Sequence, residues 1–437
     1  WRADVDAVLT DGSRLAGVAI AGTARGRFAA TEARGVAIDA RVAGGRIVAK
    51  GDAGRPDDAL AFDIELPKLG AVQPLAERWL PAPLEGRLAA KGTATLAPRA
   101  LGVEARVEGE RLRVGADVAA AKLDGRIAWR PQEGAPGGAV RLDVALDARE
   151  LDAAGVRLER ASVSVRGSAA AHRVELRARV GERDVEGALE GALDLDTPAW
   201  RGTVASFRAS GDGALALEAP AKLELARGRV ALEGAHLSFA AGRFRVDDLA
   251  VVEGRISSHG GFTGVPLESA ARLAGVALPF ASDVALGGAW SIDAAPRLSG
   301  SVSIRRERGD VRYDAGSGAS REEASIGLER LELEARLASD AVDGAATLAS
   351  ARGGNATLAF AIGPSPTAAP GTLRGDAPLS ARFDGTWSSL KFLQPWLGTA
   401  ATADGRVRIA LEAKGTLGAP VVSGKIAGDA LRFDAPQ

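Results

Sequence analysis

Hydrophobic and polar residues alternate without interruption through one stretch near the C-terminus of the chain, residues 405–417. In "GRVRIALEAKGTL" (405–417), Val407, Ile409 and Leu411 alternate with charged or small residues. Successive side chains of a β-strand point to opposite faces of its sheet. The pattern therefore predicts a strand with one apolar and one solvated face. What covers the apolar face decides what kind of protein this is.

The same alternation recurs from one end of the chain to the other, separated by short Gly- and Asp-containing steps typical of hairpin turns. At roughly 12 to 15 residues per strand and turn, the length predicts on the order of 25 to 30 antiparallel strands. The apolar positions that mark this face most clearly are Val140, Leu142, Val144, Leu146, Val174, Leu176, Leu223, Leu225, Leu331, Leu333 and Leu337, together with Val407, Ile409 and Leu411.

Helical patterns are few and short. We expect short amphipathic helices within 69–83, 266–275 and 390–398, and loops within 130–138, 308–323 and 363–371, where Pro, Gly and Ser are frequent. The predicted fold is all-β: a long, curled antiparallel sheet forming a taco-like hydrophobic groove with a few short amphipathic helices. A two-sheet sandwich also explains the alternation. Two observations argue against a sandwich: aromatic residues, which usually fill such a core, make up only 4% of the chain, and there are few predicted helices to cover a sheet.

Composition argues against several classes of function. The net charge is -1. The chain therefore has no excess of basic residues of the kind that would indicate a nucleic-acid partner. The absence of Cys excludes thiol catalysis and thiolate metal sites. The three histidines, His172, His236 and His259, lie far apart in the sequence, and no metal-ligand spacing or nucleophile motif is present. We therefore expect the protein to be no enzyme and to hold no cofactor. A curled sheet with its apolar face inward would form a groove lined by small aliphatic side chains, and such a groove would suit acyl chains.

The chain contains no Met and begins within a predicted strand at Trp1. We interpret it as a fragment of a longer protein, with residues 1–437 forming one continuous repetitive β-groove. Similar segments at 67–116 and 388–437 suggest internal sub-repeats. No apolar run approaches the length of a membrane-spanning helix.

The C-terminal segment carries a family resemblance. "LQPWLG" followed by "DGRVRIALEAKGTLGAPVVSGKIAGDALRF" (393–433) resembles the TamB family, the translocation and assembly module proteins, within the wider AsmA-like group of the Gram-negative envelope. A weaker copy begins at Gln73, with Gly86 and Lys91-Gly92-Thr93 in matching order. Segments 199–239 and 297–311 also resemble the family.

The resemblance implies a bridge-like lipid transfer protein in the periplasm. Its parent chain would be anchored in the inner membrane by an absent N-terminal helix and would contact membranes through missing terminal segments. Phospholipid would be the ligand. An outer-membrane barrel assembly protein would be a partner, bound through a part of the parent not present here. The family has no catalytic residues to transfer.

Three hypotheses follow. In the first, the apolar residues named above are the wall of a phospholipid conduit that supports outer-membrane integrity. In the second, the sheet is a scaffold for outer-membrane protein (autotransporter) assembly, offering edge strands for strand addition. In the third, it is a surface-exposed adhesin-like β-structure with a dry core.

Overall fold

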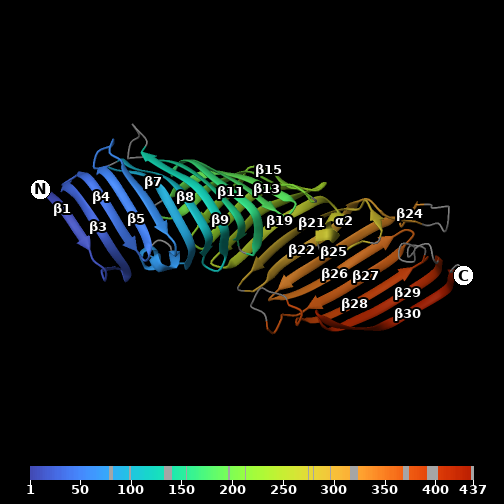
Figure 1. The fold of residues 1–437 in the computed structure, drawn as a ribbon. Coiled ribbons are helices and arrows are strands. Elements are labelled where there is room, and N and C mark those ends of the chain that lie inside the picture. The colour runs from blue at the N-terminus through green and yellow to red at the C-terminus, as the bar shows by residue number, and fades with distance from the viewer. Residues whose placement is uncertain are drawn as a thin grey trace. The chain divides into compact units, whose positions relative to one another are not determined.

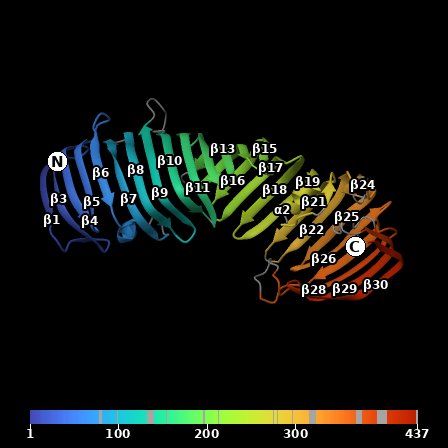
Figure 2. The ribbon, with the colours of Figure 1, turned by 45° about the vertical axis from the view of Figure 1, so that its right-hand side comes forward.

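The structure is a computed structural model. It describes residues 1–77, 82–97, 100–131, 140–153, 155–194, 197–211, 213–273, 275–278, 280–295, 297–314, 323–367, 374–390 and 402–434. These residues contain 30 strands, and the pairings described between them are antiparallel. Contacts divide the chain into two compact units, Trp1–Gly211 (unit 1) and Asp212–Gln437 (unit 2), shown in Figures 1 and 2. The all-β prediction is confirmed.

Unit 1 is an antiparallel meander in which strands pair with their sequence neighbours, except that β1 pairs with β3 and not with the short β2. Figure 2 shows its N-terminal strands side by side in chain order. A 3₁₀ turn and a short helix, η1 and α1, interrupt the meander between β6 and β7. The elements are β1 (Arg2–Leu9), β2 (Arg14–Leu15), β3 (Val18–Ala29), β4 (Ala33–Val42), β5 (Gly45–Ala53), β6 (Leu60–Leu66), η1 (Leu69–Val72), α1 (Gln73–Ala76), β7 (Leu84–Ala97), β8 (Ala100–Val114), β9 (Val118–Pro131), β10 (Val140–Ala153), β11 (Val156–Ser168), β12 (His172–Val180), β13 (Arg183–Asp194) and β14 (Ala199–Ala209).

Unit 2 continues the meander pattern but carries extra segments at one end of its strands. Helix α2 and a separate three-stranded sheet of β20, β23 and β24 are inserted between the long strands. The elements are β15 (Leu215–Ala219), β16 (Ala221–Ala226), β17 (Arg229–Phe239), β18 (Gly242–Val252), β19 (Arg255–Pro266), α2 (Leu267–Leu273), β20 (Ala281–Ser282), β21 (Ala285–Ala294), β22 (Ser299–Arg308), β23 (Val311–Asp314), β24 (Glu323–Ser325), β25 (Leu328–Ala338), β26 (Ala341–Ser350), β27 (Gly354–Ile362), β28 (Pro378–Trp387), β29 (Thr402–Thr416) and β30 (Ala419–Asp434).

Short turns set the register of many hairpins. Ala43 and Gly44 join β4 to β5 with φ of 51° and 82°, and Ser339 and Asp340 join β25 to β26 with φ of 52° and 68°. Two successive residues with positive φ form the turn whose twist matches that of the strands. The hairpin turns predicted between the alternating runs are therefore present at these two chain reversals.

The helix and loop predictions have mixed outcomes. Residues 69–76 and α2 fall within predicted helical segments, while most of 390–398 lies outside the described residues. The expectation of a loop over 308–323 is partly wrong, because β23 occupies 311–314 and pairs with β20 and β24. The strand is only four residues long and is followed by a Gly- and Ser-rich stretch. Its alternation is therefore too short to be recognised as a strand from the sequence.

The two predicted sub-repeats share a bulge. In the β7–β8 hairpin, Gly86 (φ 105°) lies at a register shift, and Arg111 on β8 has φ of 49°. In the β29–β30 hairpin, Gly405 (φ 119°) and Ala430 (φ 52°) repeat this arrangement. Matching ion pairs flank the two bulges: Arg87–Glu110 (3.8 Å) and Arg406–Asp429 (3.9 Å). Bulges increase the local twist of a hairpin.

Candidate functional site: the apolar sheet face

Each unit has one apolar and one polar sheet face. In β10, Leu142, Val144 and Leu146 are half-buried, whereas Asp143 and Asp147 are exposed. In β29, Val407, Ile409 and Leu411 are half-buried, whereas Arg408 between the first two is exposed. Residues directly opposite in an antiparallel pair project from the same face. Strand register therefore shows how far each apolar row extends.

In unit 1, two adjacent apolar rows cross nine strands, from β6 to β14. Both rows contain aliphatic, aromatic and glycine residues and no charged residue. The first is Phe62, Gly92, Ala105, Ile127, Val144, Val165, Val174, Leu189 and Val204, and the second is Ile64, Ala90, Val107, Gly125, Leu146, Val163, Leu176, Gly187 and Phe207.

Unit 2 repeats this construction. One charge-free row crosses its strands from β17 to β30, and a second runs from β25 to β30. The first is Leu237, Phe244, Phe262, Gly288, Ile304, Leu333, Ala346, Leu358, Phe383, Leu411 and Gly424. The second is Leu331, Leu348, Ala356, Gly385, Ile409 and Ile426.

The register shows which predicted wall residues come together. Val144 and Val174 share one row, and Leu146 and Leu176 share its neighbour. Leu333 and Leu411 share a row in unit 2, as do Leu331 and Ile409.

The other predicted residues occupy further rows. Leu142 lies opposite Trp129 and Gly167, Leu223 opposite Leu232, Leu225 opposite Val230, Leu337 opposite Val342, and Val407 opposite Trp387. The backbone of Val140 is in β10, but its side chain lies outside the described set.

Aromatic rings on the apolar face of unit 2 lie over glycines of neighbouring strands. A Cβ at Gly344 would be 2.4 Å from the Phe360 ring, and one at Gly260 would be 2.5 Å from the Trp290 ring. No Cβ fits at these distances, so glycine lets each ring settle onto the sheet. Phe244 and Phe262 also stack, with centroids 5.5 Å apart. The face therefore carries many aromatic rings that protrude little from the sheet.

A dry cluster covers part of this face in unit 2. Val284 (0% exposed), Leu286 (6%) and Leu328 (4%) form its centre. Partly buried side chains that pack against it come from α2, from the inserted segments and from the long strands; they are Phe262, Leu267, Ala270, Ile304, Val311, Ile326, Leu331 and Leu348. In this part of unit 2, the apolar face is therefore covered by other segments of the same chain. Leu331, a predicted wall residue, packs against the cluster.

One histidine lies on the apolar face of unit 1, with both ring nitrogens engaged. Trp200 Nε1–H donates to His172 Nε2 (2.8 Å), and His172 Nδ1 lies 2.9 Å from the carbonyl oxygen of Ser168. Because Nε2 accepts, Nδ1 carries the hydrogen and donates to that carbonyl. His172 therefore satisfies polar groups at the edge of an otherwise apolar surface.

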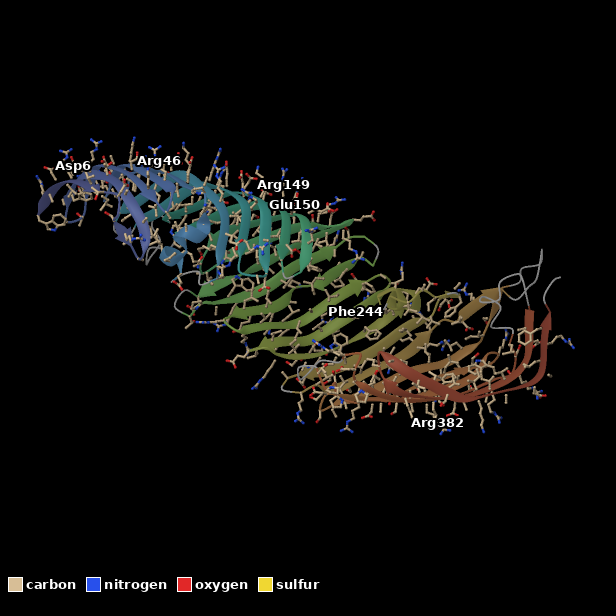
Figure 3. The ribbon with its side chains drawn as sticks, turned by 60° about the horizontal axis from the view of Figure 1, so that its bottom comes forward. Asp6, Arg46, Arg149, Glu150, Phe244 and Arg382 are labelled. Carbon is tan, nitrogen blue, oxygen red and sulfur yellow. The ribbon has the colours of Figure 1, made fainter. Side chains whose placement is uncertain are left out.

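The opposite faces carry exposed ion pairs across neighbouring strands. Examples are Asp39–Arg46 (2.7 Å) and Lys91–Asp63 (3.3 Å) in unit 1. Figure 3 shows Arg46 projecting outward from unit 1, and Arg382 projecting outward from unit 2. The hydrogen bond from Arg46 lowers the pKa of Asp39. These pairs keep one face solvated, and exposed pairs of this kind contribute little stability.

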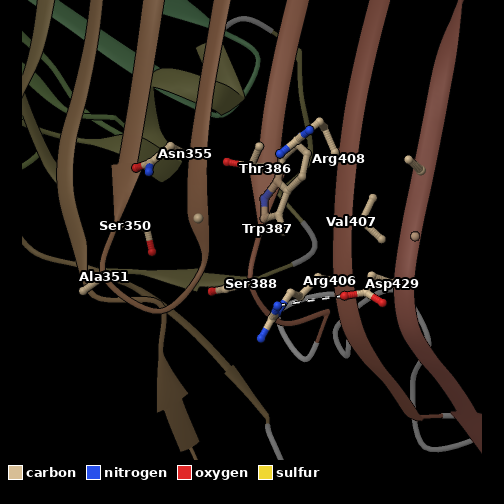
Figure 4. A pocket seen from close by; sticks show the side chains of 13 residues that line it. Ser350, Ala351, Asn355, Thr386, Trp387, Ser388, Arg406, Val407, Arg408 and Asp429 are labelled. Atoms are coloured by element: carbon tan, nitrogen blue, oxygen red, sulfur yellow. Dashed lines mark ion pairs between the residues drawn. The ribbon is translucent and has the colours of Figure 1, made fainter.

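Two open hollows have mixed linings. One, of about 590 Å³, is lined at one end of β26–β30 by residues that include Asn355, Trp387 and Arg408, with the Arg406–Asp429 pair beside them (Figure 4). The other, of about 570 Å³, is lined by neutral residues and by three Arg and three acidic residues: Glu159, Arg160, Arg177, Arg179, Asp184 and Glu186. Neither combines an apolar interior with converging polar groups, as small-molecule sites usually do.

The part of the chain that the structure describes holds no group of three or more potential metal ligands. Within the same residues, no helix has the length and apolarity needed to cross a membrane. Comparison with protein-family models, curated proteins and solved structures found no match.

The alternation in the sequence indicates which side chains share the apolar face, but two features of the site do not follow from it. The glycines beneath aromatic rings could have been suspected, since Gly interrupts strands where side chains would otherwise alternate. The dry cluster gave a weaker signal, because Val284 immediately precedes β21, Leu286 is the second residue of that strand, and Leu267 follows Pro266. Those residues lie far from Leu328 in sequence, and their contact depends on how the inserted segments fold back.

Proposed function

We propose that this chain is part of a periplasmic conduit that carries phospholipid between the inner and outer membranes and supports outer-membrane integrity. The parent protein would be anchored in the inner membrane by a segment outside this chain. Another segment outside it would bind an outer-membrane barrel partner. The observation that carries the proposal is the set of apolar rows, each free of charge, that cross many strands in each unit.

The energetics favour a hydrocarbon ligand on such a face. Transfer of each methylene out of water is worth about 0.8 kcal/mol, so a chain of about 16 carbons gains roughly 12 kcal/mol by remaining covered. Successive rows offer similar small aliphatic surfaces, so a chain could move along a unit with little change in burial. Half-buried residues such as Val144 and Leu333 are available for this contact.

The proposal is tested by a charge placed in a row, with a matched charge on the other face. In Leu333→Arg the guanidinium enters the row on the apolar face. In the control Ala345→Arg it enters the polar face of the adjacent strand, where Ala345 is exposed opposite Glu334. The unaltered protein and both variants would be expressed in a bacterial periplasm, purified without detergent and extracted for lipid.

The unaltered protein and Ala345→Arg are expected to retain phospholipid, and Leu333→Arg to lose most of it. Circular dichroism and thermal unfolding would show whether the variants remain folded. Equal lipid in both folded variants, or no lipid in any sample, would contradict the proposal.

A further inference from the structure

The dry cluster divides the apolar face of unit 2 along the length of its strands. It gathers β19 (through Phe262), the start of β21, the start of β25 and the inserted segments around α2. On β25, Leu328 is buried at its centre and Leu331 packs against it. Ala335 lies four residues beyond Leu331, about 13 Å along the strand at roughly 3.3 Å per residue.

The row through Ala335 lies outside this cluster and crosses nine strands from β18 to β29. Gly260 is buried, the other members are half-buried, and none carries a charge. They are Val246, Gly260, Trp290, Val302, Ala335, Gly344, Phe360, Ala381 and Ala413.

The two largest side chains in this row, Trp290 and Phe360, are those that lie over Gly260 and Gly344. Every other member is Val, Ala or Gly. The row is therefore low, continuous and free of hydrogen-bonding side-chain groups other than the indole N–H, which donates to Ser258 Oγ at 3.0 Å. Its chemistry complements an uncharged hydrocarbon chain, which makes no hydrogen bonds.

We propose that unit 2 carries acyl chains along the row through Ala335, while the dry cluster closes the part of the face nearest α2. This rests on the proposed lipid-carrying function and narrows it to one part of the sheet. The cluster would act as a fixed side wall that keeps acyl chains in contact with the low row. Leu331, expected from the sequence to line the conduit, would belong to that wall's packing and not to the ligand surface.

The test uses the natural absence of cysteine, which makes every introduced thiol unique. Three positions on β25 report on the three environments: Leu331→Cys in the cluster, Ala335→Cys in the row, and Glu334→Cys on the polar face. Leu328→Cys is a second cluster position. Each variant would be delipidated and treated with a small maleimide, with and without loaded dipalmitoyl phosphatidylethanolamine, and the rate of thiol modification measured.

Without lipid, Leu328→Cys, at a position that is 4% exposed, is expected to react at least about tenfold more slowly than Ala335→Cys, because its reaction requires local opening. Leu331→Cys, which packs against the cluster, is expected to react more slowly than Ala335→Cys by a smaller factor. Lipid is expected to slow Ala335→Cys at least about tenfold by covering it, and to leave Glu334→Cys unchanged. The same thermal unfolding midpoint across the variants would show that the rates compare folded proteins.

The outcomes separate the inference from the function on which it rests. Protection of both Ala335→Cys and Leu331→Cys by lipid, with similar rates in its absence, would overturn the divided face but retain lipid binding. Protection of neither, with lipid shown to be absent from the protein, would overturn both. Protection of Ala335→Cys by a co-purifying protein instead of lipid would assign the row to a protein partner and also overturn the inference.

Discussion

Units 1 and 2 are built from the same alternating pattern, yet their apolar faces differ. Unit 1 presents rows dominated by Val, Leu and Ala, with Trp200 and His172 joined at one edge. Rings lie over glycines in both units, Trp200 over Gly191 in unit 1 and Phe360 over Gly344 in unit 2, but unit 2 also covers part of its face with the dry cluster. The alternation sets which side chains share a face. The segments inserted between strands decide whether that face is covered.

The largest difference between the units is expected in the free energy of unfolding when a carboxylate replaces an apolar side chain of the apolar face or of the cluster that covers it. Val284→Asp puts a carboxylate at a fully buried position of unit 2. We expect a loss of more than about 3 kcal/mol in the free energy of unfolding. Val144→Asp, at a half-buried position of unit 1, should cost about 1 kcal/mol. Urea unfolding followed by circular dichroism measures both. Equal losses would mean that the dry cluster does not stabilise unit 2.

Glycine substitutions sharpen the comparison at intermediate cost. In unit 2, Gly344→Val would drive a Cβ into the Phe360 ring and should cost about 1–3 kcal/mol. In unit 1, a Cβ at Gly187 would meet its nearest atoms at 3.7 and 3.8 Å, so Gly187→Val should be neutral or stabilising by up to about 1 kcal/mol. Thermal unfolding of the two variants checks the signs. Destabilisation by Gly187→Val would show that glycine is required in both units for another reason.

A smaller, pH-dependent effect is expected in unit 2. His259 Nδ1 lies 2.9 Å from both carboxylate oxygens of Asp248, and this hydrogen bond raises the pKa of His259. The pair's contribution should therefore be complete below the unfolded pKa of about 6.5 and disappear as pH rises through the higher folded value. Unfolding midpoints from pH 5.5 to 8.5, for example, should fall less steeply in Asp248→Asn than in the unaltered protein. Identical slopes would exclude this pair as the cause.

The smallest effects should be alike in both units. Arg111 and Ala430 have left-handed backbone conformations at equivalent bulges. Glycine tolerates this conformation, so Arg111→Gly and Ala430→Gly should each stabilise by about 0.5 kcal/mol, the strain relief being partly offset by unfolded-state entropy. Ala427→Gly, in the same strand as Ala430 but without positive φ, is the control and should be destabilising. Stabilisation at one bulge alone would break their equivalence.

Sequence analysis could predict those parts of the fold that depend on local periodicity. The alternation in β10, β25 and β29 identified both the strands and the side chains that share their apolar rows. The matching glycines Gly86 and Gly405 indicated repetition, and both lie at equivalent bulges. Such features are encoded within a few residues of one another.

Features that depend on contacts distant in sequence could not be predicted in this way. Val284 and Leu328 are 44 positions apart, and neither alternation nor turn signals place them together. Phe360 covers Gly344 because β26 and β27 pair in one register, which a shift of one residue would abolish. The row that remains uncovered in unit 2 follows from these contacts.

Native mass spectrometry of the unaltered protein, expressed in a bacterial periplasm and purified without detergent, tests the central claim most directly. The account predicts species heavier than the bare chain by whole phospholipid masses, which dissociate on collisional activation to leave folded protein of the chain's own mass. A single folded species at the bare mass, unchanged after incubation with phosphatidylethanolamine vesicles, would contradict it.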